Sequence, residues 1–204
     1  MAESLEPWTE SPPRLDVAVI GTGKAGSVLG AALMRAGHNV VACTAVSDVS
    51  RLRAESLLPG VEITSVADAV KNCDLILFTV PDDVLPELVH GLAATAAVSP
   101  GTFVVHAAGR YGVEILASLT QAGCLPLALH PVMTFTGTSV DLNRLSGCPF
   151  GVTAPEVLRP VAEALVVEMG GDPVWVPEEH RALYHAALAF GANGLMALVS
   201  ETSS

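Results

Sequence analysis

The hydrophobic positions of the chain change their period repeatedly, and this change predicts strands and helices in turn. An apolar run from Leu15 to Ile20 has the length of a buried strand. From Ala25 to Ala36 the apolar residues recur at helical spacing, and a second apolar run, from Asn39 to Thr44, follows Gly37. Strand, helix and strand in this order predict a βαβ unit with two parallel strands.

The same alternation continues to about residue 177. Further strands are expected at 61–64, 74–80, 101–106, 125–129, 150–153 and 174–176. Helices are expected from Ser47, over 67–71, after a cap formed by Pro81-Asp82-Asp83, from Arg110 to about Gln121, and from Pro155 to about Gly170, while 132–146 is expected to be a loop over a cleft. This order predicts an α/β fold: a Rossmann-like, doubly wound, mostly parallel sheet.

The final stretch, from Ala182 to Ser200, contains no formally charged side chain. Tyr184, His185 and Asn193 argue against a membrane span, and a helix that is apolar on all sides is typical of one buried in protein. The helix either packs against another subunit or begins a helical domain that is truncated, and we favour truncation. The domains expected are a flexible leader at 1–13, a Rossmann domain at 14–177 and an incomplete helical domain at 178–204.

A glycine-rich turn joins the first strand to the first helix, with the sequence Gly21-Thr22-Gly23-Lys24-Ala25-Gly26. In this G-x-G-x-x-G pattern the first glycine permits a tight turn, the second allows a pyrophosphate to approach the backbone, and the third allows close packing of helix on strand. The amides at the helix start then favour a phosphate. The context of strand, turn and helix therefore predicts a dinucleotide site.

The end of the second strand indicates which dinucleotide is bound. Proteins that bind NAD place a carboxylate there, but positions 43–45 carry Cys, Thr and Ala, and Asp48 comes too late. Thr44, Ser47 and Arg51 are suited to contact the 2′-phosphate of NADP. We therefore expect NADP, with NAD possible, although Arg51 also fits an ordinary solvated charge.

Polar side chains follow several of the predicted strands, where an open α/β sheet binds its ligands. The first group is Thr79-Val80-Pro81, and His106 and His130 end two later strands. On the last helix, His185 and Asn193 are two i+4 steps apart and so lie on roughly one face. Histidine suits proton exchange because its pKa lies near neutrality. Each of these residues is a candidate for catalysis, and the alternative is a hydrogen-bonded structural role.

Composition narrows the classes of function. The net charge is −11, with only 10 Lys and Arg residues in 204, which argues against a nucleic-acid or anionic-membrane partner. The four cysteines lack C-x-x-C spacing and are typical of reduced, cytoplasmic thiols, and the histidine spacing gives no metal motif. No G-x-S-x-G motif supports nucleophilic catalysis, and residues 1–13 do not form a signal or transit peptide.

Several segments resemble a known family when taken in order: VAVIGTGKAGSVLGAAL, LFTVPDD, VVHAAGR, LALHPVMTFTG, CPFGVTA and LYHAALAFGANGL. They are similar to Rossmann-like proteins with a C-terminal helical domain of unknown function, in the 6-phosphogluconate dehydrogenase-like superfamily. Ketopantoate reductase and pyrroline-5-carboxylate reductase are relatives. The resemblance implies an NADP-dependent oxidoreductase acting on a small keto acid or imine, and a homodimer formed through the helical domain.

The resemblance also implies roles for residues. The glycines of the turn would hold the pyrophosphate, Val80 and Pro81 would line the nicotinamide, and His106, His130 and Asn193 would meet the substrate. Two positions depart from the family pattern, because Ala108 stands where the family often has Ser and Gly194 where it usually has His. The alternative function is therefore a non-catalytic dinucleotide-binding protein.

Overall fold

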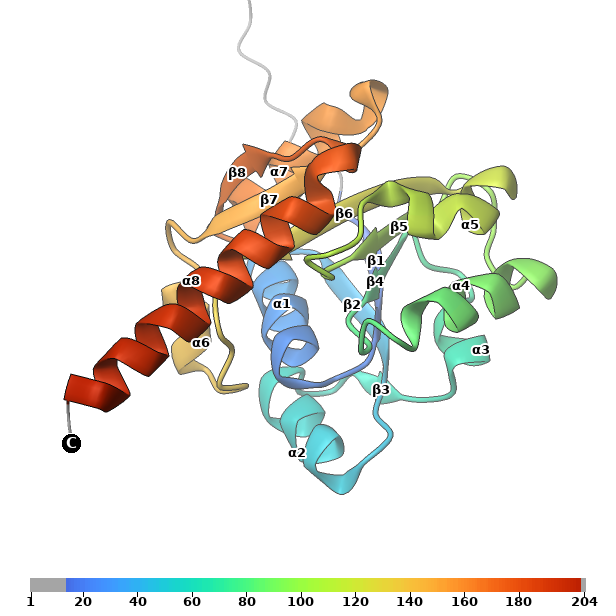
Figure 1. The fold of residues 1–204 in the computed structure, drawn as a ribbon. Coiled ribbons are helices and arrows are strands. Elements are labelled where there is room, and N and C mark those ends of the chain that lie inside the picture. The colour runs from blue at the N-terminus through green and yellow to red at the C-terminus, as the bar shows by residue number, and fades with distance from the viewer. Residues whose placement is uncertain (1–13, 203–204) are drawn as a thin grey trace, which may run out of the picture.

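The computed structural model describes the backbone of residues 14–202 and the side chains up to Ala192. Within these residues eight strands form one sheet, in the order β3-β2-β1-β4-β5-β6-β7-β8 (Figure 1). The strands are β1 (Asp16–Ile20), β2 (Asn39–Thr44), β3 (Glu62–Ile63), β4 (Leu75–Phe78), β5 (Phe103–His106), β6 (Leu125–Pro131), β7 (Pro149–Thr153) and β8 (Asp172–Trp175).

Strand direction divides the sheet into two parts. The strands β1 to β6 are all parallel, whereas β7 pairs antiparallel with β6, and β8 is parallel to β7. The chain reverses its progress across the sheet between β1 and β4, and open α/β sheets bind ligands at such a switch point. The predicted doubly wound, mostly parallel sheet is confirmed.

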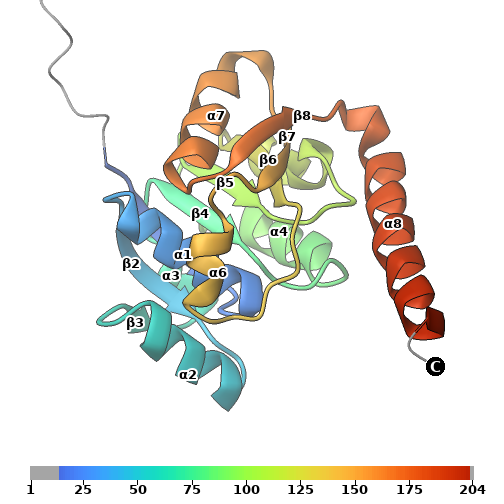
Figure 2. The ribbon, with the colours of Figure 1, turned by 90° about the vertical axis from the view of Figure 1, so that its left-hand side faces the viewer.

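Helices cover both faces of the sheet (Figures 1 and 2). On one face lie α1 (Lys24–Arg35), α2 (Asp48–Leu57), α6 (Val140–Arg144) and α7 (Arg159–Glu168). On the other face lie α3 (Val66–Ala69), α4 (Leu85–Ala94), the short 3₁₀ helix η1 (Val113–Leu116) and α5 (Ala117–Gln121). Two further 3₁₀ helices, η2 (Glu156–Leu158) and η3 (Glu178–His180), precede α7 and α8 (Arg181–Thr202).

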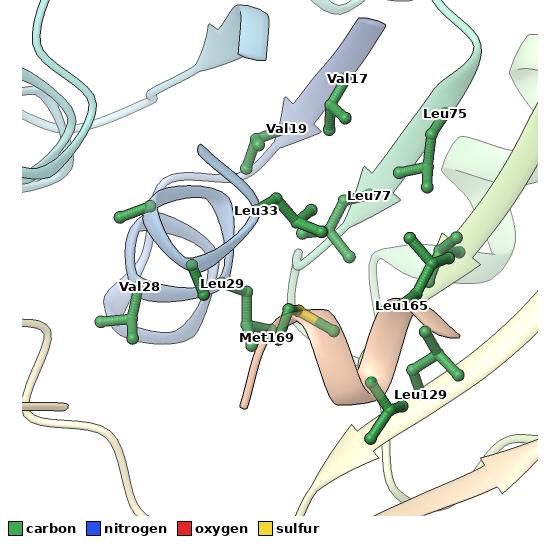
Figure 3. Packing of buried hydrophobic residues seen from close by; sticks show 14 of the residues in the cluster. Val17, Val19, Val28, Leu29, Leu33, Leu75, Leu77, Leu129, Leu165 and Met169 are labelled. Carbon is green, nitrogen blue, oxygen red and sulfur yellow. The ribbon is translucent and has the colours of Figure 1, made fainter. Parts of the chain in front are cut away.

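The strands are buried on both sides, which explains why they appear in the sequence as continuous apolar runs. Alternate residues of β1 and β4 point to opposite faces, and one set packs beneath α1 and α7. Figure 3 shows this set with its helical partners: Val17, Val19, Val28, Leu29, Leu33, Leu75, Leu77, Leu129, Leu165 and Met169. This core fixes the start of α1 beside the ends of β1 and β4.

Three local expectations were wrong. The helix α4 is not capped by Pro81-Asp82-Asp83, because the Pro81 carbonyl accepts from the amides of Val84 and Leu85 and forms a turn that leads into the helix. The segment 132–146 is not all loop, since it contains α6. The helix α7 begins at Arg159, after η2, so Pro155 lies before it and Pro160 occupies its first turn.

The helix expected from Arg110 to Gln121 is also wrong in its first half. Residues 113–116 form η1, and only 117–121 are α-helical. The carboxylate of Glu178 accepts from the backbone amides of Val113 (2.7 Å) and Glu114 (3.2 Å). These bonds, which come from a segment 65 residues away, hold the start of η1 in place.

The last helix, α8, runs away from the sheet beyond its first turns (Figure 2). Two of its apolar side chains lie largely in solvent, since Leu183 is 69% and Phe190 81% exposed. No helix in the described part of the chain is both long enough and apolar enough to cross a membrane.

Candidate functional site

The three glycines of the turn between β1 and α1 meet three different requirements. Gly21 has a φ of +101°, which favours glycine. Gly26 is buried, and a Cβ there would collide with the Gly21 carbonyl oxygen and with Thr79 Oγ1. At Gly23, in contrast, a Cβ would meet nothing within 4 Å. The fold itself therefore needs glycine at positions 21 and 26, whereas position 23 borders open space.

Neighbouring strand ends anchor the turn. The Gly21 amide donates to Thr44 Oγ1 (2.9 Å), and the Thr22 amide and hydroxyl both donate to the Thr44 carbonyl (2.9 Å each). The Thr22 hydroxyl also lies 3.2 Å from the Ser50 carbonyl, and Thr79 Oγ1 donates to the Gly21 carbonyl (2.6 Å). In the structure, Thr44 and Thr79 therefore hold the glycine turn in shape.

The helix α1 starts without a side-chain cap. Gly23 is its N-cap and offers no hydrogen-bonding side chain, and Lys24 and Ala25 follow as the first helical residues. Amides at a helix start lack intrahelical partners, and together with the helix dipole they favour an anion. The open space beside Gly23 gives such an anion access to the backbone.

The start of α2 differs because it carries its own cap. Ser47 Oγ accepts from the Ser50 amide (3.2 Å), and Ser50 Oγ accepts in return from the Ser47 amide (2.9 Å). This places the Ser47 hydroxyl in a capping box, a role that sequence reasoning missed. Arg51 follows in the first turn with its side chain exposed, so its contact with a 2′-phosphate stays a prediction.

The residues after β4 lie beside the same turn. The Cβ position of Gly21 is 3.0 Å from the Thr79 carbonyl oxygen and 3.2 Å from Val80 Cγ1, and Pro81 follows with its ring exposed. Thr79 and Val80 therefore adjoin the glycine turn at the switch point, and Pro81 comes next in the chain. Their contact with a nicotinamide ring stays a prediction.

His106, at the end of β5, is fully buried, and both of its ring nitrogens have backbone partners. Nε2 lies 2.8 Å from the Gly112 carbonyl oxygen, and Nδ1 accepts from the Ala108 amide (3.2 Å). Burial, followed by the charge of Arg181, lowers the pKa of His106 to about 4, although the bond to Gly112 opposes this shift. In this arrangement His106 shapes the loop 107–112.

The buried, neutral His106 should make the folded protein less stable as the pH falls. The unfolded chain binds a proton at His106 near pH 6.5, whereas the folded chain excludes it down to about pH 4, so the free energy of unfolding should decrease as pH falls through this window. We expect a loss of roughly 1.5 kcal/mol between pH 6.5 and 5 from this residue. Urea unfolding of the wild type and His106→Asn across this range measures it, and equal slopes in the two proteins would contradict the burial of a neutral His106.

A second cluster forms where the first turns of α8 meet the end of β6. His130 Nδ1 lies 2.8 Å from the Tyr184 hydroxyl, and the rings of His130 and His185 are 6.2 Å apart. Both imidazoles approach Gly109, where a Cβ would lie 2.8 Å from His130 Nε2 and 2.6 Å from His185 Nδ1. The structure therefore brings together two of the predicted histidines and adds Tyr184, which sequence reasoning missed.

Arg181 fixes α8 to the sheet. Its side chain is 2% exposed, and its guanidinium donates from Nε to Thr153 Oγ1 (2.6 Å) and from Nη2 to the carbonyls of Ala128 and Gly151 (3.0 Å each). Gly151 leaves room for Tyr184, whose hydroxyl would collide with a Cβ there. Arg181, Tyr184 and His185 are spaced i, i+3 and i+4, and this spacing was the signal available in the sequence.

Burial keeps the His130–Tyr184 pair neutral. It lowers the pKa of His130 to about 4, with the charges of Arg181 and His185 adding to the effect, and it raises the pKa of Tyr184. A neutral phenol and a neutral imidazole therefore share this hydrogen bond at pH 7. The His185 Nδ1 atom is buried and has no hydrogen-bond partner among the described residues.

One candidate residue, Asn193, remains to be placed. The backbone of Asn193 belongs to α8, but its side chain lies outside the described residues. Among the residues that are described, no group of three metal-binding side chains is found.

The strand order, the switch point and the glycine turn define a Rossmann-like α/β protein. The chain belongs to the Rossmann-like domain family, whose profile matches residues 3–131. Residues 148–204 match a domain of unknown function (DUF2520). The predicted resemblance is confirmed.

Several known proteins are similar to this chain over most of its length. A glycerol-3-phosphate dehydrogenase [NAD(P)+] of Bradyrhizobium sp. (strain ORS 278) is 29% identical over 171 residues, which are 76% of this chain and half of that protein. A predicted NADP oxidoreductase from Bacteroides fragilis has a TM-score of 0.73 at 21% identity, covering 93% of this chain and 72% of that one. An imine reductase variant from Myxococcus stipitatus, solved with NAD+, has a TM-score of 0.69 at 21% identity, covering 93% and 64%. These two structural matches establish the fold.

Proposed function

We propose that the protein is an NADP-dependent oxidoreductase that transfers hydride between NADPH and a small keto acid or imine, in the manner of ketopantoate reductase. The observation that carries the proposal is Gly23. It borders open space at an uncapped helix start, while Gly21 and Gly26 are required by the fold. A pyrophosphate fits this opening because it needs free amides and a backbone without a Cβ.

The names of the similar proteins support a nicotinamide cofactor, since they include NAD(P)+ and NADP. We assign the pyrophosphate to the glycine turn and the nicotinamide to the side of Val80 and Pro81. When bound, the reduced cofactor supplies a hydride, and the protein must place the substrate and exchange a proton.

The proton exchange is assigned to His130, with Tyr184 and His185 beside it. A neutral Tyr184 that donates to His130 Nδ1 leaves the ring proton on Nε2, which lies on the side of Gly109 and His185. This N–H is suited to donate a hydrogen bond to a carbonyl oxygen or an imine nitrogen. When it gives up its proton, Nδ1 takes the proton of the Tyr184 hydroxyl, so the imidazole stays neutral and the tyrosinate is reprotonated from solvent. We also propose that Asn193 contacts the substrate, because it lies on α8, the helix that carries His185.

The function is tested by titrating the protein with NADPH and NADH, and then measuring NADPH oxidation with a panel of 2-keto acids and cyclic imines. Binding with turnover supports the proposal, and no binding of either dinucleotide overturns it. Both ring nitrogens of His106 are hydrogen-bonded to the backbone, so neither is free to contact a substrate. This observation favours a second candidate function, that of a non-catalytic dinucleotide-binding protein. Tight NADPH binding without turnover on any substrate would support that candidate.

Gly109→Ala should separate chemistry from cofactor binding. The new Cβ would press against both imidazoles, displacing His130 Nε2 and His185 Nδ1. We expect turnover to fall by roughly 100-fold, the size of a lost acid–base group, with the NADPH Kd unchanged. Steady-state kinetics and a binding titration measure the two effects, and unchanged turnover would place the chemistry elsewhere.

We also propose that the protein forms a homodimer through α8. The exposed Leu183 and Phe190 support an interface on this helix. Sedimentation equilibrium tests this, and a monomer at every concentration, both with and without residues 182–204, would reject it.

A further inference from the structure

The bulkiest fully buried side chain in the described part of the chain carries a charge. Arg181 donates to three neutral groups, the Thr153 hydroxyl and the carbonyls of Ala128 and Gly151, and its Nη1 atom is buried without a hydrogen-bond partner among the described residues. None of the ion pairs between described side chains includes Arg181. Burial of an unpaired charge is costly. The attachment of α8 to β6 and β7 requires donors at this position, but it does not require a full positive charge.

Tyr184, one turn further along α8, lies against this charge. The Arg181 Cζ atom is 5.7 Å from the centre of the Tyr184 ring, and the Tyr184 hydroxyl lies 2.8 Å from His130 Nδ1. Burial raises the pKa of Tyr184, and the charge of Arg181 opposes this rise. Burial lowers the pKa of Arg181, and Tyr184 opposes that shift in turn. The two groups therefore stabilise each other when Tyr184 is ionised.

The proton exchange assigned to His130 ionises Tyr184. As the substrate carbon accepts hydride, the substrate oxygen or nitrogen takes the proton of His130 Nε2, and His130 Nδ1 takes the phenol proton of Tyr184. The electron pair of the broken O–H bond stays on Tyr184 as a phenolate, which solvent then reprotonates. A fixed positive charge beside the pair favours this route, because it disfavours an imidazolium on His130 and favours an anion on Tyr184.

The other titratable groups around the pair leave Arg181 as the source of this charge. The carboxylate of Glu178 also acts on Arg181, but it accepts from the amides of Val113 and Glu114. Burial keeps two of the neighbouring histidines and one thiol uncharged at pH 7, because it lowers the pKa of each of these histidines to about 4 and raises the pKa of the thiol. The groups that face Arg181, Tyr184 or the imidazole between them are His106 on β5, His130 on β6, Cys148 before β7 and His185 on α8.

We propose that Arg181 is the electrostatic partner of Tyr184 in proton transfer, and that its charge stabilises the Tyr184 phenolate while His130 stays neutral. The inference rests on the proposed function. It gives Arg181 a positioning role that acts through Tyr184, beyond the attachment of α8 to the sheet. It also accounts for a buried charge that has no ion-pair partner among the described side chains.

The coupling is tested by ¹⁹F NMR of the full chain with its tyrosines replaced by 3,5-difluorotyrosine, whose phenol ionises near neutral pH. The chain has two tyrosines, Tyr111 and Tyr184, so Tyr111→Phe assigns the signals. Arg181→Met removes the charge, and the pKa of the Tyr184 phenol should then rise by about 1 or more. Arg181→Lys keeps the charge and should leave this pKa close to its wild-type value.

Two controls separate the charge from the attachment of the helix. Thr153→Val removes the acceptor of Arg181 Nε but keeps the guanidinium, so the pKa of the Tyr184 phenol should not change. Arg110→Met removes an exposed guanidinium that lies 4.9 Å from the centre of the Tyr111 ring, and solvent screening should leave the pKa of Tyr111 nearly unchanged. An unchanged Tyr184 in Arg181→Met, or an equal rise in Thr153→Val, would overturn the inference.

Two further measurements apply if Arg181→Met does not fold. Arg181→Gln is also neutral but keeps an amide donor for the strand carbonyls, and the same rise in the pKa of Tyr184 is expected. In the wild type, ¹⁵N spectra of the histidine rings should show a neutral His130 at pH 7 with its proton on Nε2, because Tyr184 donates to Nδ1. A proton on Nδ1 would make Tyr184 the acceptor, and the inference would fall without any substitution.

Turnover then links the coupling to the proposed function. In Arg181→Met, kcat for NADPH oxidation should fall about 10-fold or more, as for the loss of an electrostatic stabiliser, with the NADPH Kd within about twofold of the wild type. The cofactor affinity is expected to hold because Arg181 contacts β6 and β7 and not the glycine turn. Wild-type turnover in Arg181→Met would overturn only the inference. Failure of the wild type to bind either dinucleotide would overturn the proposed function, and the inference with it.

Discussion

Gly23→Val is expected to weaken NADPH binding by at least 100-fold while the protein stays folded. The backbone at Gly23 is extended, with φ of −68° and ψ of −166°, so valine fits without strain, and a Cβ there meets no protein atom within 4 Å. The branched side chain would instead occupy the space assigned to the pyrophosphate. We expect the free energy of unfolding to fall by no more than about 1 kcal/mol, because valine is a poorer N-cap than glycine.

NADPH fluorescence titration and urea unfolding measure the two quantities on the same samples. Gly23→Ala provides a graded control and should give a smaller loss of affinity, because its single methyl group fills less of the opening. If Gly23→Val binds NADPH as tightly as the wild type, the cofactor does not lie on this turn.

Gly26→Ala is expected to have the opposite profile, with a large loss of stability. Its Cβ would collide with the Gly21 carbonyl oxygen, and that oxygen cannot yield easily because it accepts from Thr79 Oγ1. We expect the free energy of unfolding to fall by about 3 kcal/mol, the upper range for an overpacked buried site. A loss of NADPH binding would follow from the distorted turn.

Gly91→Ala is the matched control for this substitution. Gly91 also lies within a helix, α4, but a Cβ there meets nothing within 4 Å. Alanine should therefore leave stability unchanged or raise it by roughly 0.5–1 kcal/mol, since glycine is a weak helix former. Urea unfolding compares the two variants, and equal stability of Gly26→Ala and Gly91→Ala would show that the turn tolerates a side chain at position 26.

Local patterns predicted the parts of the fold that depend on neighbouring residues. The glycine spacing and the apolar runs identified the turn, the parallel strands and the helices around them, because burial and tight turns restrict residue types directly. The same patterns placed polar residues after the strands, and the carboxyl ends of the parallel strands β1, β4 and β5 lie at one edge of the sheet.

Contacts between distant segments could not be predicted in this way. His106 was a candidate for catalysis, but a hydrogen bond to the Gly112 carbonyl is a property of the folded loop and not of the sequence pattern. Glu178 holds η1 from 65 residues away, and this contact explains why the predicted helix there was too long. The antiparallel direction of β7 likewise has no local signal, because apolar runs look alike in either direction.

The residues proposed to meet the substrate show the same difference between what local patterns predict and what long-range contacts decide. His130 was predicted from its place at a strand end, and His185 from its place on the last helix. Their meeting depends on Arg181, which the apolar appearance of α8 concealed, and on Gly109 and Gly151, whose lack of a Cβ admits the rings. The signals available in the sequence were the position of Arg181 directly before the uncharged stretch 182–200 and its i, i+3 and i+4 spacing with Tyr184 and His185.

The most direct test of the cofactor assignment is a crystal structure of the protein grown with NADPH. We predict electron density for the pyrophosphate against the amides of Gly23 to Gly26, at the start of α1. Density for the dinucleotide at any other place on the sheet, or an empty glycine turn at saturating NADPH, would contradict the assignment.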